Sequence, residues 1–204
     1  MAKSSSTSLM ASVLFLGVIA VGQAAENFTT PMETIRSSNE EISAILAEHD
    51  PLDAEGEARV YQVMNDVTDF VTMSTGAIDE ICVEYELTDE TCGEWKTVFG
   101  DLLRIRSIKG VGRYRADHFD YLNEEIDGEQ AVVNTLAYFE GEDIALDYEL
   151  LLREDRWRIV NYVVDDVDTA RSWNRRFIRL LKTETVDDVI QRLRDRIDEY
   201  QSES

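Results

Sequence analysis

The spacing of apolar residues changes twice along the chain, and these changes limit the folds that the sequence can adopt. Between residue 31 and about Tyr114, apolar residues recur every three or four positions, as on one face of a helix. From Tyr114 to Asp165 they alternate with polar residues, which is typical of strands with one buried face. From Thr169 the helical spacing returns. Helices, strands and helices in this order predict an α+β domain.

Start and stop signals place the first helices. Pro31 opens a helix that is expected to end near Asp50, because a residue before proline disfavours the helical conformation. Helical spacing also covers residues 58–81, with a break expected near residues 65–68.

The remaining helices follow from the same signals. Thr91 fits a capping box with Glu94, and Gly110 is expected to stop that helix. Two more helices are expected at residues 169–181 and 185–200, near the C-terminus.

Four alternating segments predict an antiparallel meander, at residues 118–124, 131–139, 144–153 and 156–165. The fold expected is a curved antiparallel sheet of about four to five strands, covered by N-terminal and C-terminal helices. Because such a sheet does not close on itself, a gap between its apolar face and the helices would enclose an apolar cavity.

The N-terminus carries the features of an export signal. Lys3 precedes an apolar run at residues 9–21, and small residues follow it. We expect residues 1–24 to be a signal peptide cleaved after Ala24, with Ala25 as the alternative point and a retained anchor as the other possibility. Residues 25–204 would then form a single exported domain.

The charge balance excludes two classes of partner. The chain has 42 acidic and 20 basic residues, a net charge of −22. Nucleic-acid binding needs clustered Lys and Arg, and an anionic membrane surface would repel this chain. Because 44% of the residues are hydrophobic, the acidity does not indicate disorder.

Cys82 and Cys92 are the two cysteines. In an exported protein, a close pair of this kind favours a disulfide. A catalytic thiol would need a base, and only His49 and His118 are available. Two cysteines with two scattered histidines also make a poor zinc site.

The sequence offers little catalytic chemistry. It has no nucleophile elbow, phosphate loop, zinc-protease motif or dinucleotide-binding glycine pattern. His118 is expected to be a surface residue. An acidic cluster, Asp165, Asp166 and Asp168, precedes the next helix. Its carboxylates are expected to stabilise the positive N-terminal end of that helix, although they could also bind a cation. We expect no catalytic residue, no metal and no cofactor.

Arginines recur on the helix expected at residues 169–181. Arg171, Arg175 and Arg179 are each one turn apart, and Arg176 lies beside them. They could form a solvated face that pairs with carboxylates. They could instead form a small basic area that meets a phosphate headgroup or an acidic partner.

The order of four segments resembles the periplasmic phospholipid-binding component of the Mla lipid-transport system, the toluene-tolerance family. The resemblance covers most of the mature chain. The segments are DFVTMSTGAI, EWKTVFGDLL, RWRIVNYVVDDVDTARSWNRRFIRLL and VIQRLRDRI.

Single positions both match this family and depart from it. The family's last strand carries Trp and ends in Asp, before a Gly-Val-Ser turn and a helix with Tyr-Arg and Phe. The matching residues are Trp157, Asp165, Val167 and Phe177, together with Asp69, Phe70 and Met73 further upstream. The departures are Asp166 for Gly, Asp168 for Ser, Trp173 for Tyr and Asn174 for Arg. The acidic stretch between the cysteines is a further departure.

The resemblance implies a monomeric periplasmic carrier with no enzymatic activity. It would hold phospholipid tails between sheet and helices and shuttle lipid between an outer-membrane lipoprotein complex and an inner-membrane ABC transporter complex. Its headgroup or partner contacts would fall on Arg171, Arg175 and Arg179. The cavity lining expected is Trp95, Phe99, Leu103, Leu136, Tyr148, Leu150, Ile159, Val163, Trp173 and Phe177. Plain core packing is the alternative for each of these ten.

Two other functions stay open from the residues. A small α+β enzyme with a cone-shaped pocket would need an acid–base pair, such as His118 with a carboxylate, facing the cavity. A non-lipid periplasmic binding or adaptor module would have a sealed core with no tunnel between sheet and helices.

Overall fold

A computed structural model describes residues 29–113 and 116–202, so the expected signal peptide lies outside the described residues. The expected domain boundary therefore stays a prediction. Within the described part the chain forms six helices and five strands. The helices are α1 (Pro31–Glu48), α2 (Ala54–Val67), α3 (Phe70–Glu84), α4 (Asp89–Arg113), α5 (Thr169–Leu180) and α6 (Val186–Ser202). The strands are β1 (His118–Asp127), β2 (Gln130–Phe139), β3 (Glu142–Arg153), β4 (Arg156–Val164) and β5 (Val167–Asp168).

Side-chain caps and one break define the first three helices. Thr30 and Glu33 form a capping box at the start of α1. The break expected within the second helical stretch is confirmed, and it separates α2 from α3. Thr68 pairs there with Ile159 of β4, and the Asp69 N–H donates to the Ile159 carbonyl at 2.9 Å. The break therefore attaches the junction between the two helices to the sheet.

Helix α4 differs from its expected bounds at both ends. Its first turn is capped by Thr88, whose hydroxyl accepts from the Thr91 N–H at 3.2 Å, so Thr91 is not the cap. Gly110 does not stop the helix, which continues to Arg113. A glycine in αR conformation costs only about 1 kcal/mol against alanine, which neighbouring contacts can offset.

The five strands form one antiparallel sheet in the order β1-β2-β3-β4-β5. Tight turns join them, and Glu140 and Gly141 both have positive φ, as the favoured hairpin turn requires. In the register of β2 and β3, Ala137 faces Ile144 and Leu136 faces Ala145. Because neighbouring side chains on a strand point to opposite faces, Ala137 and Ile144 share one face and Leu136 and Ala145 the other.

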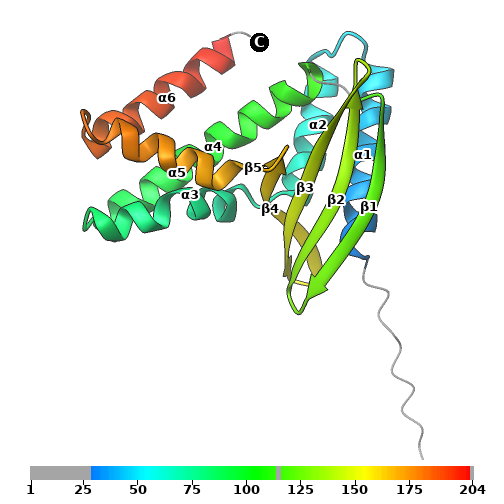
Figure 1. The fold of residues 1–204 in the computed structure, drawn as a ribbon. Coiled ribbons are helices and arrows are strands. Elements are labelled where there is room, and N and C mark those ends of the chain that lie inside the picture. The colour runs from blue at the N-terminus through cyan, green and yellow to red at the C-terminus, as the bar shows by residue number, and fades with distance from the viewer. Residues whose placement is uncertain (1–28, 114–115, 203–204) are drawn as a thin grey trace, which may run out of the picture.

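Figure 1 shows two groups of elements side by side. Helices α1 and α2 pack against one face of the curved sheet, while α3, α5, α6 and most of α4 form a helical group beside it. Helix α5 packs on α3 and β4, and α6 packs on α4. The expected α+β class, with an unclosed antiparallel sheet, is confirmed.

An aromatic cluster and a disulfide hold the helical group together. Phe177 of α5 is fully buried, and its ring lies edge-to-face on Trp95 at 5.1 Å and on Phe99 at 4.9 Å between centroids. The disulfide between Cys82 and Cys92 links α3 to α4. The rings and the disulfide therefore link α3, α4 and α5, within a hydrophobic core that also includes buried residues of the sheet.

Candidate ligand-binding site

An apolar cavity of about 450 Å³ lies between the inner face of the sheet and helices α1, α2 and α4. Strands β2, β3 and β4 form one wall, and the apolar side of α1 forms the opposite wall. The main apolar lining residues are Ile35, Ile42, Leu46, Met64, Val67, Val111, Phe119, Ala137, Phe139, Ile144, Leu146, Tyr148, Ile159, Tyr162 and Val164.

The strand register explains why these sheet residues meet. Thr135 faces Leu146 and Val133 faces Tyr148, so the inner positions of β2 and β3 lie in adjacent rows. On β4, Tyr162 faces Tyr148 across the pair. Alternation directs Ile144, Leu146 and Tyr148 of β3 into the cavity, and a register shift on β4 allows both Ile159 and Tyr162 to line it.

Several polar side chains in the wall have hydrogen-bond partners within the protein. Asn39 of α1 donates to the hydroxyls of Tyr121 at 3.2 Å and Tyr148 at 3.4 Å. The Tyr162 hydroxyl shares a 3.2 Å hydrogen bond with Thr68. Burial raises the pKa of Tyr162 to about 12, with the Thr68 hydrogen bond acting in the opposite direction. Burial also raises the pKa of Tyr148 well above its usual range.

The cavity is suited to enclosing an apolar molecule. Among the described residues, its lining includes no Asp, Glu, His, Lys or Arg. An acid–base pair of the kind an enzyme would need therefore does not face it from the described part. His118 instead stacks on Tyr138, with ring centroids 4.0 Å apart, at an exposed end of β1.

The ten residues expected in the lining lie in four places. Tyr148 and Ile159 line the cavity. Leu150 is buried on the same face of β3, two residues from Tyr148. Leu136 and Val163 alternate with lining residues and so point to the opposite face of the sheet. The other five lie in the helical group, namely Trp95, Phe99, Leu103, Trp173 and Phe177.

Sequence reasoning did not assign the helix α1 side of the cavity. Ile35, Ile42 and Leu46 lie in its wall. Their helical spacing was visible, but it marks an apolar face without identifying what the face covers. Phe119 and Ile144 were likewise within recognised strands, and their alternation was the available signal.

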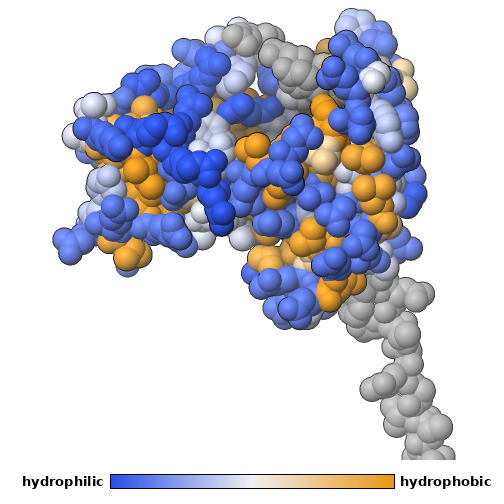
Figure 2. Space-filling model, in the orientation of Figure 1, coloured by the Kyte–Doolittle hydropathy of each residue, from blue (hydrophilic) through white to orange (hydrophobic). Residues whose placement is uncertain are grey.

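The arginines of α5 lie away from the cavity. Arg171, Arg175 and Arg179 are exposed, and Figure 2 shows strongly hydrophilic atoms along this helix. The cavity meets the start of α5 only at Thr169 among the described residues. A headgroup or partner role for the three arginines stays a prediction.

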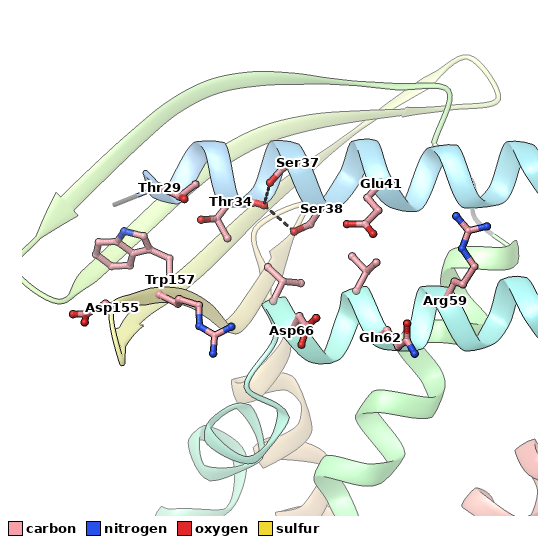
Figure 3. Close-up of a pocket in the computed structure, with 13 residues that line it drawn as sticks. Thr29, Thr34, Ser37, Ser38, Glu41, Arg59, Gln62, Asp66, Asp155 and Trp157 are labelled. Atoms are coloured by element: carbon pink, nitrogen blue, oxygen red, sulfur yellow. Dashed lines mark hydrogen bonds between the residues drawn. The ribbon is translucent and has the colours of Figure 1, made fainter. Parts of the chain in front are cut away.

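A second, polar pocket of about 380 Å³ lies between α1, α2 and the start of β4 (Figure 3). Ser37 and Ser38 border it and both donate to the Thr34 carbonyl. Ser38 and Val67 line both pockets, so the polar pocket and the apolar cavity adjoin. The carboxylates and hydroxyls of the polar pocket suit a solvated ligand rather than an acyl chain.

Neither a membrane span nor a metal centre is found in the described part of the chain. None of its helices combines the length and apolar character needed to cross a bilayer. No three of its His, Cys, Asp and Glu side chains are grouped so as to hold a metal ion.

Comparisons with known proteins agree with this geometry. A family model described as "MlaC protein" matches residues 36–195. A solved structure of a phospholipid-binding protein from Ralstonia solanacearum, in complex with a phospholipid, is similar with a TM-score of 0.67 and 18% identity. The similarity covers 83% of this chain and 98% of that chain. No curated protein matches.

Proposed function

Because this chain belongs to the MlaC family, as its sequence resemblance indicated, we propose that it is a carrier that encloses the acyl chains of a phospholipid. The headgroup would stay in contact with water. The observation that carries this proposal is the apolar cavity between the sheet and α1, α2 and α4.

The energetics favour an enclosed site. Each methylene of an acyl chain exposed to water costs about 0.8 kcal/mol. A lipid therefore moves through an aqueous compartment only if apolar side chains cover its tails. The described lining is apolar apart from hydroxyl and amide groups, several of which bond to one another, and this supports the fit.

The similar structure supports the same ligand class. That protein is a phospholipid-binding protein captured with a phospholipid, and its fold extends over nearly all of the domain described here. In this chain we propose that the tails contact Ile42, Leu46, Phe139 and Ile144, together with the expected Tyr148. The expected residues of the aromatic cluster would then stabilise the helical group without touching lipid.

We further propose the cellular role that the family resemblance implies. After loss of its signal peptide, the protein would act as a periplasmic monomer without enzymatic activity. It would move phospholipid between an outer-membrane lipoprotein complex and an inner-membrane ABC transporter complex. The alternative of a non-lipid adaptor predicts a sealed core, and the open cavity counts against it.

Lipid extraction tests the proposal. The mature protein is purified from cells without detergent and extracted with chloroform and methanol, and phospholipid is quantified by phosphorus content. We expect phospholipid in a fixed molar ratio to protein. Protein that yields none, and that takes up none from phospholipid vesicles, would refute the carrier function. Transfer of a fluorescent phospholipid from donor to acceptor vesicles tests the shuttling step separately.

A further inference from the structure

The apolar cavity has an exposed end and a buried end. At the first end, Val164 is 37% exposed and Ile144 is half-buried. At the second end, Ile35, Tyr148 and Ile159 are 1%, 4% and 3% exposed. A ligand therefore reaches the cavity from the Val164 end, and the part of the ligand that enters first stops at the other end.

Tyr148 marks the buried end on the sheet. Val133 and Leu150 are the next residues on the same face, and both are buried without bordering the cavity. The packed core therefore begins directly behind the Tyr148 ring. Asn39 of α1 donates to the hydroxyls of Tyr148 at 3.4 Å and Tyr121 at 3.2 Å. These hydrogen bonds from the facing wall hold the ring across the end of the cavity.

The depth of the cavity matches the length of an acyl chain. Ile144 and Tyr148 line it from the same strand, four residues apart. Because an antiparallel strand rises about 3.4 Å per residue, the two residues lie about 14 Å apart. The hydrocarbon core of a bilayer is about 30 Å thick, so the tails of one leaflet extend about 15 Å. The cavity is therefore about as deep as one tail is long.

We propose that Tyr148 sets the length of the acyl chain that the protein carries, with Ile35 and Ile159 completing the wall on which the chain ends. A longer chain would leave its excess methylenes in water at the exposed end. A shorter chain would leave apolar side chains at the buried end without contacts. This inference rests on the proposed function, because it concerns the same cavity and the same class of lipid.

Two substitutions move the buried end in opposite directions. Tyr148→Val removes the ring, and Asn39 keeps its hydrogen bond to Tyr121. Ile159→Phe places a larger side chain at the same end. The matched control is Tyr138→Val, because Tyr138 alternates with Ala137 and so lies on the opposite face of the sheet. Its hydroxyl also takes part in a hydrogen bond, which it donates to Asp120 at 3.0 Å.

The test measures which chain lengths each protein takes up. The proteins are incubated with vesicles that contain equal amounts of phosphatidylglycerol and phosphatidylethanolamine with monounsaturated chains of fourteen, sixteen, eighteen, twenty and twenty-two carbons. Each protein is then separated from the vesicles by size-exclusion chromatography. The phospholipid extracted from it is measured by mass spectrometry.

We expect the wild type and Tyr138→Val to share one preferred chain length. Tyr148→Val should prefer chains about two carbons longer, with the ratio of the longer to the wild-type length rising about tenfold. Ile159→Phe should prefer shorter chains, and this variant decides the matter if Tyr148→Val does not fold. An unchanged length profile in the folded variants, or a wild type without any length preference, would overturn this inference and leave the carrier function intact. A wild type that takes up no phospholipid would refute both.

Discussion

Tyr148 of β3 and Tyr162 of β4 pair across the sheet, and their rings meet edge-to-face with centroids 5.6 Å apart inside the cavity wall. Both hydroxyls have protein partners, Asn39 for one and Thr68 for the other. Bonded hydroxyls leave the apolar ring faces as the surface available to a ligand. The same burial also makes this wall sensitive to alkaline pH.

The first prediction concerns this alkaline sensitivity. An unfolded tyrosine loses its proton near pH 10, whereas burial raises the pKa of Tyr162 to about 12. Tyr162 therefore contributes stability that is fully present below about pH 10 and is lost as the pH rises towards 12. We expect the free energy of unfolding, measured in urea, to fall over this range less steeply in Tyr162→Phe than in the wild type.

An exposed tyrosine provides the control for that measurement. Tyr61 lies on α2 and is 43% exposed, so Tyr61→Phe removes one phenol without touching the cavity. In this variant the free energy of unfolding should fall with rising pH as steeply as in the wild type. If both variants follow the wild-type curve, the buried phenol of Tyr162 does not control alkaline stability.

The second prediction separates packed core from cavity wall. Phe177→Ala should lower the free energy of unfolding by about 3–5 kcal/mol, because it empties a closely packed aromatic cluster. Phe119→Ala makes the same chemical change at a half-buried position that borders existing space, and should cost less than about half as much. Urea denaturation measures both, and equal losses would mean that Phe119 is as tightly packed as Phe177.

The third prediction concerns the disulfide between α3 and α4. The double substitution Cys82→Ala and Cys92→Ala opens a loop of sequence separation 10 and should lower the free energy of unfolding by about 2–3 kcal/mol. Neither cysteine lines the cavity, so lipid content should not change. Chemical denaturation with and without a reducing agent gives the comparison. A wild type that is equally stable when reduced would contradict the prediction.

The fold could be predicted because its signals are local. The change from helical to alternating spacing near Tyr114, and its return at Thr169, placed the helices and strands in their observed order. The errors lay at helix ends, where competing caps decide the boundary. Thr88 and Thr91 both have capping side chains, and only the backbone geometry selects Thr88.

The cavity was harder to predict because it depends on relationships between elements. Alternation says that Leu136 and Ala137 point to opposite faces, but the register and the position of α1 decide which face is inside. Trp95 and Phe177 have the large apolar side chains expected of either a lining or a core. Only packing between α4 and α5 distinguishes the two roles.

Two alanines on adjacent strands allow the most direct test of the central claim. Ala137 lines the cavity, whereas Ala145 points to the opposite face of the sheet. Each is replaced by Phe, and phospholipid bound to the purified protein is measured by native mass spectrometry. We predict that Ala145→Phe retains the wild-type amount and that Ala137→Phe loses most of it, because the new ring occupies the space for the acyl chains. Equal phospholipid in both variants would contradict lipid binding in this cavity.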